Sequence, residues 1–203
     1  MKLITVRHGE SVSNDAGVTA GWADVELNEN GLEQAKKVAD RLKNEDVDVI
    51  YSSDLKRASR TAEEIAKLHD CELILDKRLR EQDKGKYEQG PAKKMWDGFG
   101  ASGEDILEWT PKDGESAGTV KGRVMEFLNE IRGRHQDKTV LIVSHGVVLA
   151  VLSRTFCNET DFDGDIKKEE WKKHKHKNSS VSKYTFSDGK WKVVRLNCTE
   201  HLE

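Results

Sequence analysis

The chain has 203 residues, of which 35% are apolar and 35% charged, and its formal net charge is −3. This length and composition predict one domain, residues 1–203, with a modest core and many solvated helix faces. The nearly balanced charge argues against a nucleic-acid partner, so any attraction for an anion has to be local. No apolar run approaches the roughly 18 residues of a membrane-spanning helix, which argues against a membrane partner.

Three widely spaced cysteines, Cys71, Cys157 and Cys198, form no C-x-x-C pair. An odd number of cysteines at such spacing is typical of reduced thiols rather than of a disulfide framework. We therefore expect a cytoplasmic protein without disulfide bonds.

The first 75 residues alternate short apolar runs with amphipathic stretches. They predict strands at 3–6, 47–51 and 73–75, and helices at 32–42 and 55–66. Apolar strands separated by helices indicate a mainly parallel sheet that is covered on both faces. The predicted fold class is therefore α/β, a three-layer α/β/α sandwich.

Each of these two helices has polar candidates for the residue that caps its N-terminus. They are Asn28 or Asn30 for the first helix and Ser53 or Asp54 for the second. The apolar positions that recur at helical spacing are Leu32, Ala35, Val38, Ala39 and Leu42 in the first helix, and Leu55, Ala58, Ala62, Ile65 and Ala66 in the second. These positions are expected to face the sheet.

Residues 80–115 differ from their surroundings in composition. They are rich in glycine and contain both prolines of the chain. Long irregular segments inside a compact domain are often functional, so this segment is predicted to form a lid insertion over one edge of the sheet. Its aromatic residues Trp96, Phe99 and Trp109 are expected to pack the lid onto the domain rather than to form a wall for the substrate.

Regular patterns return after residue 115. Ser116 is the candidate cap of a helix whose apolar stripe holds Val120, Val124, Phe127, Leu128 and Ile131. The wholly apolar run 140–144 predicts a central strand, and 147–152 predicts a buried helix. Residues 180–196 are predicted to form an antiparallel hairpin that turns at Ser187-Asp188-Gly189.

A lysine-rich stretch, 167–178, separates this helix from the hairpin and includes His174 and His176. Charged stretches of this kind are usually solvated helix faces or loops, and that is the expectation here. Two histidines at i and i+2 on a helix do not converge on one metal ion, so no metal site is predicted.

A histidine follows each of two predicted strands. His8 comes just after 3–6, and His145 comes just after 140–144. Because the carboxyl ends of parallel strands meet at the edge where open α/β sheets bind ligands, both histidines are expected in one pocket. Gly9 lets the backbone come close to a ligand there. A neutral imidazole with one nitrogen held as a donor can attack phosphorus with the other, so the pocket is predicted to bind phosphate.

Two arginines are candidates for holding the phosphate oxygens. Arg7 directly precedes His8 and carries a planar fork that suits two oxygens. Arg57 lies off the apolar stripe of its helix, so core packing does not explain it, and its helix begins at the same end of the sheet. His145 opens a helix whose N-terminal amides also favour an anion.

A leaving alkoxide needs a proton, and the region 80–115 contains six acidic candidates. A carboxyl group beside a phosphate dianion has a raised pKa, which suits a general acid near neutral pH. This chemistry does not choose among Glu81, Asp83, Glu88, Glu104, Asp105 and Glu115.

Six short blocks stand in a fixed order along nearly the whole chain. They are Arg7-His8-Gly9-Glu10-Ser11 with Asn14, Gly21-Trp22 with Asp24 to Leu27 and Gly31, the stretch Ser52 to Ala62, Leu79-Arg80-Glu81 with Gly85 and Tyr87-Glu88, Gly114-Glu115-Ser116, and Ser144-His145-Gly146. Together these blocks resemble the histidine phosphatase superfamily, which includes cofactor-dependent phosphoglycerate mutase and many small phosphatases. One triplet would be a weak signal, whereas six blocks in order are specific.

This resemblance implies a role for each matching residue. His8 would be the nucleophile, and Glu81 would be the proton donor. The phosphate pocket would be completed by Arg7, Arg57 and His145. The residues that would line the substrate side are Ser11, Asn14 and Gly21. The resemblance implies that hydrolysis needs no metal and no organic cofactor.

Some positions depart from the mutase branch of the superfamily. Val147 stands where mutases usually carry asparagine, Lys84 stands where an aromatic or apolar residue is common, and Gln89 interrupts a usual motif. These departures favour a phosphomonoesterase that hydrolyses a small phosphorylated metabolite through a phosphohistidine and releases inorganic phosphate. The alternatives are a phosphoglycerate mutase, a phosphoprotein phosphatase and a non-catalytic binder of a phosphorylated ligand.

Overall fold

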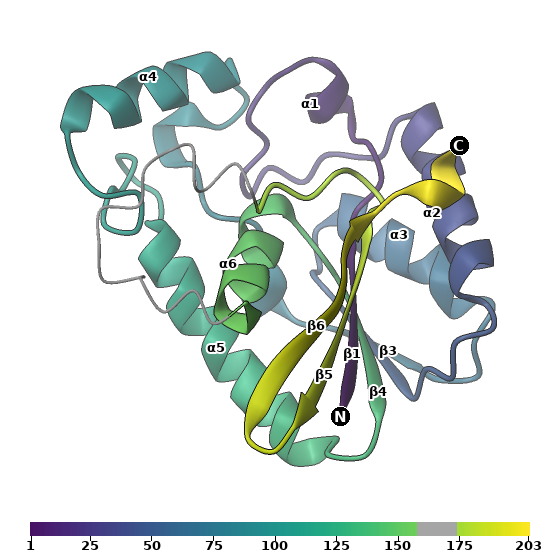
Figure 1. Cartoon of the computed structure of the whole chain (residues 1–203). Coiled ribbons are helices and arrows are strands. Elements are labelled where there is room, and N and C mark those ends of the chain that lie inside the picture. The colour runs from purple at the N-terminus through teal and green to yellow at the C-terminus, as the bar shows by residue number, and fades with distance from the viewer. Residues whose placement is uncertain (158–173) are drawn as a thin grey trace.

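The computed structural model describes residues 1–157 and 174–203. These residues form a six-stranded sheet in the order β3-β2-β4-β1-β5-β6 (Figure 1). The strands are β1 (Lys2–Arg7), β2 (Val49–Ser52), β3 (Glu72–Leu75), β4 (Thr139–Ser144), β5 (Val181–Ser187) and β6 (Lys190–Cys198). Strands β1 to β4 are parallel, whereas β5 pairs antiparallel with β1 and β6 antiparallel with β5. The predicted mainly parallel sheet with a C-terminal antiparallel hairpin is confirmed.

Helices cover both faces of the sheet, as the fold class predicts. The four long helices that do so are α2 (Glu29–Leu42), α3 (Lys56–Ala66), α5 (Ala117–Arg134) and α6 (Gly146–Phe156). Neighbouring residues of a strand point to opposite faces, so Leu3 joins one buried cluster with α5 and α6, and Ile4 joins another with α2 and α3. Leu141 and Ile142 divide between the same two clusters in β4. The three-layer sandwich therefore has two cores, one on each face.

The starts of α2 and α3 test the predicted caps. Asn28 caps α2 by accepting from the Gly31 amide, whereas α3 has no side-chain cap. Asp54 does not cap α3 because its carboxylate binds the Arg80 fork at 2.6 and 2.7 Å. Leu32 was expected to face the sheet, but it is 40% exposed because it lies on the solvent side of the first turn of α2.

The other elements before α5 gather beyond the carboxyl ends of the parallel strands, where Figure 1 labels α1 and α4. They are α1 (Val12–Asp15), the 3₁₀ turns η1 (Lys77–Leu79) and η2 (Gly85–Tyr87), and α4 (Ala92–Ser102). Phe99 of α4 packs its ring 5.5 Å from Trp109 and 6.2 Å from Trp96, centroid to centroid. Phe99 and Trp96 also pack against the cluster of α5 and α6, so these aromatic residues attach this region to the domain, as expected.

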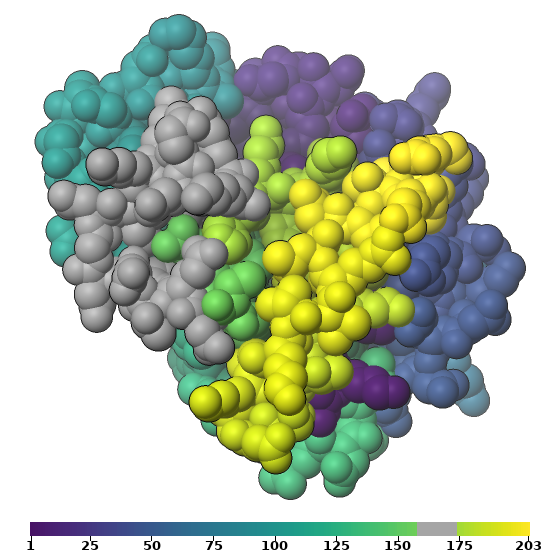
Figure 2. Space-filling model, in the orientation of Figure 1, coloured from purple at the N-terminus to yellow at the C-terminus, as the bar shows by residue number. Residues whose placement is uncertain are grey.

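The C-terminal hairpin turns at the predicted residues. Asp188 and Gly189 both adopt positive φ angles, 53° and 75°, which suit the tight turn between two twisted strands. Strand β6 then crosses one face of the molecule (Figure 2), and the chain ends in the 3₁₀ turn η3 (Glu200–Leu202).

All three cysteines lie in the described ranges and are free. In the described parts of the chain, no helix combines the length and the apolar character that crossing a bilayer requires.

Candidate active site

The two histidines meet because β1 and β4 are neighbours in the sheet. Arg7 pairs in register with Ser144, so His8 and His145 each lie one residue beyond the end of adjacent parallel strands. Their ring centroids are 5.0 Å apart, and both side chains are buried. Both imidazoles therefore lie where the pocket was predicted, at the carboxyl edge of the sheet.

The ring of His8 is held in one tautomer. Its Nδ1 lies 2.7 Å from the carbonyl oxygen of Gly9, which can only accept a hydrogen bond. Nδ1 therefore carries the proton, and Nε2 keeps its lone pair. Burial, reinforced by Arg57 and Arg7, lowers the pKa of His8 well below its usual value, so the ring is neutral at pH 7.

His145 has both ring nitrogens buried, and neither makes a hydrogen bond with any residue the structure describes. Burial and the charge of Arg57 lower its pKa well below the usual value. His145 is also the residue that precedes α6, where unpaired backbone amides carry partial positive charge. A buried polar ring without a protein partner costs free energy, so this ring is suited to an incoming polar ligand.

Two guanidinium groups flank the histidines, of which that of Arg57 is buried and that of Arg7 is partly buried. Arg57 is 1% exposed and donates to the carbonyl oxygens of Gly21 and Ala23 at 2.8 and 2.9 Å. Arg7 donates to the carbonyl oxygen of His176 at 2.7 Å, and its Nε is buried without a partner in the described residues. Burial lowers the pKa of both groups, but arginine remains charged in proteins, so two cations lie beside the two histidines.

Arg57 is more deeply buried than its position off the apolar stripe predicts. Its guanidinium is sheltered because two backbone carbonyls satisfy it, which lets a charged side chain leave water.

Glu81 comes from the region 80–115 and reaches the same pocket. Its carboxylate accepts from the Gln82 amide at 2.8 Å and from the Val147 amide at 3.2 Å, in the first turn of α6. A methyl group built on Gly146 would lie 3.6 Å from Glu81 and 3.9 Å from the Nε of Arg7, which places both side chains around the start of this helix. Of the six acidic candidates in 80–115, Glu81 is thus the one that touches the His145 turn.

The three predicted substrate-side residues lie around the loop that follows β1. Ser11 caps α1, and its backbone and hydroxyl both donate to the amide oxygen of Asn14. Gly21 has a positive φ of 55°, and its carbonyl oxygen accepts a hydrogen bond from Arg57. A Cβ at this position would collide with the carboxylate of Glu88. Ser11 is fully buried, and its observed contacts stabilise the conformation of this loop.

The segment that follows the undescribed residues was expected to be solvated, and for its histidines this expectation is wrong. His174 and His176 are 7% and 2% exposed, and Ser153 pairs with the ring of His174 at 3.0 Å. They are buried because the chain crosses the carboxyl end of β1 on its way into β5 (Figure 1). The rest of the predicted stretch, 167–173, lies outside the described residues.

Sequence reasoning missed two further neighbours of the site. Thr61 accepts from the Gly9 amide at 3.1 Å, and Asn178 contacts the backbone of His8 and Gly9. Thr61 lies in the block that carries Arg57, so its position was visible, whereas no periodicity or charge pattern singles out Asn178.

Burial of His176 makes a prediction for stability. Burial, with the charges of Arg7 and His174, lowers the pKa of His176 to about 4. Between pH 6.5 and 4 the unfolded chain therefore binds a proton at this ring that the folded chain does not bind. Its neutral ring therefore supports folding fully above pH 6.5, and this support is lost as the pH falls toward 4.

Urea unfolding at pH 7 and pH 4.5 measures the effect. We expect the free energy of unfolding of the wild type to fall by roughly 2–3 kcal/mol more than that of His176→Gln. Equal decreases for the two proteins would contradict the burial of a neutral ring at this position.

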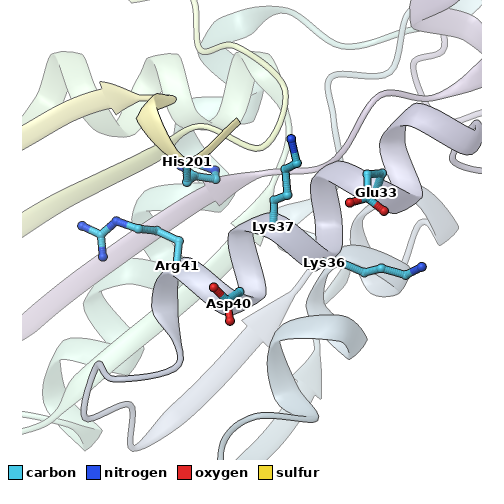
Figure 3. A pocket seen from close by; sticks show the side chains of 6 residues that line it. All are labelled: Glu33, Lys36, Lys37, Asp40, Arg41 and His201. Atoms are coloured by element: carbon cyan, nitrogen blue, oxygen red, sulfur yellow. The ribbon is translucent and has the colours of Figure 1, made fainter. Parts of the chain in front are cut away.

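Within residues 1–157 and 174–203, no group of three or more potential ligand side chains is placed to hold a metal ion. A separate hollow of about 480 Å³ lies between α2 and η3. Its lining residues are Glu33, Lys36, Lys37, Asp40, Arg41 and His201. Its basic side chains point in different directions (Figure 3), and Lys37 donates to the carbonyl of Leu202, so they do not converge on one anion.

Comparison with known proteins gives consistent matches across the chain. A family model described as the histidine phosphatase superfamily, branch 1, matches residues 3–199. Phosphoserine phosphatase 1 of Hydrogenobacter thermophilus is 35% identical over 100% of this chain and 94% of its own length. A probable phosphoglycerate mutase GpmB of Photorhabdus laumondii is 37% identical over 76% of this chain and 74% of its own. The solved structure of YhfR of Bacillus stearothermophilus superposes with a TM-score of 0.88 at 29% identity, covering 100% of this chain and 99% of that one. The chain thus belongs to the histidine phosphatase superfamily, branch 1, and is a phosphatase.

Proposed function

We propose that this phosphatase hydrolyses a small phosphate monoester through a covalent intermediate on His8. The Nε2 lone pair attacks phosphorus, so a P–N bond forms while the P–O bond to the leaving group breaks. Arg7, Arg57 and His145 hold the equatorial oxygens and stabilise the charge that they carry in the transition state. The observation that carries this proposal is a neutral imidazole with Nδ1 fixed on Gly9, beside the buried guanidinium of Arg57 and the partly buried one of Arg7.

Proton transfer in this proposal belongs to Glu81. Protonated Glu81 gives its proton to the leaving oxygen, and the resulting carboxylate then takes a proton from the water that attacks the phosphohistidine. The P–N bond breaks, inorganic phosphate leaves, and His8 is again neutral. Contact of Glu81 with the Val147 amide supports this assignment, because it fixes the carboxyl group at the start of α6.

Glu81→Gln tests this role through the leaving group. An alkyl phosphate needs a proton on its leaving oxygen, whereas p-nitrophenolate departs without one. We expect kcat/KM, which reports only the steps up to departure of the leaving group, to fall about 10²–10⁴-fold for an alkyl phosphate and far less for p-nitrophenyl phosphate. Steady-state kinetics on both substrates measure the split, and equal losses of kcat/KM on both would remove Glu81 from proton transfer to the leaving group.

We further propose that the substrate carries a carboxylate in addition to its phosphate. A relative named as a phosphoserine phosphatase supports this class. Lys84 is 8% exposed and donates to the side chain of Gln82. It follows the proposed proton donor Glu81 by three residues. Both belong to the region 80–115, which we propose to act as the lid of a single domain. Burial lowers the pKa of Lys84, and the negative charge of Glu81 raises it. A bound substrate carboxylate would therefore stabilise the charged form of Lys84. The proposed lining of the substrate side is Ser11, Asn14 and Gly21.

Lys84→Met tests the carboxylate. We expect KM for phosphoserine to rise about 10–100-fold, while KM for p-nitrophenyl phosphate, which has no carboxylate, changes little. Lys93→Met is the matched control, because Lys93 is exposed on α4 and pairs only with Asp97 among the described residues. An equal rise in KM on both substrates would argue against carboxylate recognition by Lys84.

Mutase activity is the second candidate, because one relative is named as a probable phosphoglycerate mutase. A mutase would return the phosphoryl group to the other hydroxyl of its substrate rather than to water. Incubation with 3-phosphoglycerate and a bisphosphoglycerate primer separates the two: release of inorganic phosphate favours the phosphatase, and isomerisation without release favours the mutase.

A further inference from the structure

We propose that Asn178 is a positioning residue that holds His8 in the tautomer able to attack phosphorus. This inference rests on the proposed function. The Nδ2 of Asn178 lies 3.1 Å from each of three oxygens, namely the carbonyls of His8 and Gly9 and the amide oxygen of Asn14. Asn178 lies 169 positions from Gly9 along the chain, in the segment 174–180 that leads into β5.

The chemistry of these neighbours fixes the orientation of the Asn178 amide. Two of the three oxygens are carbonyls, and the third accepts hydrogen bonds from the backbone and hydroxyl of Ser11. All three are therefore acceptors, and only the NH₂ group of Asn178 is compatible with them. Its two hydrogens are shared among three acceptors, two in the loop that bears His8 and one on Asn14 in α1.

The contact with Gly9 matters most, because the same carbonyl accepts the Nδ1 proton of His8 at 2.7 Å. A carbonyl oxygen has two lone pairs, and here His8 and Asn178 occupy one each. The second donor keeps the Gly9 peptide from turning away from the ring. If that carbonyl turned, Nδ1 would lose its partner and the proton would move to Nε2, the nitrogen that has to be bare for attack.

The other contacts of the segment hold the backbone around His8 rather than its ring. The Ser179 amide donates to the carbonyls of Arg7 and His8 at 3.0 and 3.2 Å, and the Arg7 amide donates to the carbonyl of Ser180 at 3.2 Å. These bonds come from the main chain and survive a change of side chain at position 178. Replacing Asn178 therefore removes its side-chain contacts to Gly9, His8 and Asn14 and leaves these main-chain bonds in place.

A second asparagine anchors the same segment, and within the described residues it makes no hydrogen bond to the loop from Arg7 to Gly9. Asn197 accepts from the Lys177 amide at 2.8 Å and donates to the carbonyl of Lys175 at 3.1 Å. Its φ is 49°, which glycine adopts without strain, so Asn197→Gly removes the anchor alone. This variant is the matched control, because it loosens the segment without taking a donor from Gly9.

The experiment compares wild type, Asn178→Ala and Asn197→Gly by rapid-quench phosphorylation with p-nitrophenyl phosphate and by ¹⁵N NMR of the histidine rings. We expect Asn178→Ala to phosphorylate His8 about 10–100-fold more slowly at saturating substrate, with KM within about threefold of wild type. We expect its His8 ring to populate the Nε2–H tautomer. Asn197→Gly is expected to keep the wild-type tautomer and a rate within about threefold, even where its melting temperature falls.

Two results would overturn the inference: an unchanged rate and tautomer in Asn178→Ala, or an equal loss in both variants that follows their melting temperatures. Asn178→Asp supplies a further arm, since it keeps the shape but donates only when protonated. Its activity relative to wild type is expected to rise as the pH falls. If the wild type forms no phosphohistidine, the proposed function fails, and the ring tautomer in the variants still decides the role of Asn178.

Discussion

His8→Ala is expected to lower kcat/KM for p-nitrophenyl phosphate by about 10⁴-fold or more and to abolish the covalent intermediate. The loss is large because, among the described histidines, His8 is the one beside both Arg7 and Arg57 whose second nitrogen is held on a carbonyl. His145 shares the pocket, but neither of its ring nitrogens has a protein partner that would set its tautomer. Trapping labelled phosphoenzyme at short reaction times measures the effect directly.

A buried ring replaced by alanine leaves a cavity, so the His8 variant needs a check on its fold. We expect its melting temperature to fall by only a few degrees and its affinity for vanadate to persist, because Arg7 and Arg57 remain. A folded His8→Ala enzyme that still accumulates phosphoenzyme would move the nucleophile to another residue.

Arg57→Ala is expected to lower kcat/KM by about 10³-fold. The guanidinium contributes a buried charge beside both histidines, and it also ties down the loop through Gly21 and Ala23. Because phosphate is bound in the ground state as well, KM should rise together with the fall in kcat. Arg57→Lys keeps the charge but not the planar fork, so it should recover only part of the loss.

Arg60→Ala is the matched control for Arg57, one turn further along α3. Arg60 is exposed and pairs with Glu63 at 2.7 Å. Its removal should leave kcat/KM within about twofold, since exposed ion pairs contribute little. Similar losses in the two variants would mean that damage to α3, rather than loss of a guanidinium that binds phosphate, explains the result for Arg57.

The meeting of His8 and His145 could be predicted because it follows from a local rule. Each histidine ends an apolar run, and parallel strands end at one edge of a sheet. Burial of Arg57 could not be predicted in the same way. A helical stripe registers apolar packing, whereas Arg57 is buried by hydrogen bonds to Gly21 and Ala23, more than thirty residues away.

Asn178 and His176 lay beyond prediction for a related reason. They belong to a polar stretch with no period, in which lysines alternate with histidines. What buries His176 and directs Asn178 is the path of the chain over the end of β1, and this path depends on tertiary structure. The predicted cap of α3 was wrong for a similar reason, because Arg80, from a turn distant in the sequence, donates to the carboxylate of Asp54.

The position of β1 in the sheet has a consequence for synthesis on the ribosome. Both of its partners are made late: β4 begins at Thr139 and β5 at Val181. When only the first hundred residues of this sequence have been made, β1 has neither of its partner strands to pair with, and exposed apolar segments of this kind are prone to aggregate. Closing so wide a loop is also slow, so the proposed active site is expected to be among the last parts to assemble. Truncation anywhere before the hairpin should give inert polypeptide rather than a weakened enzyme.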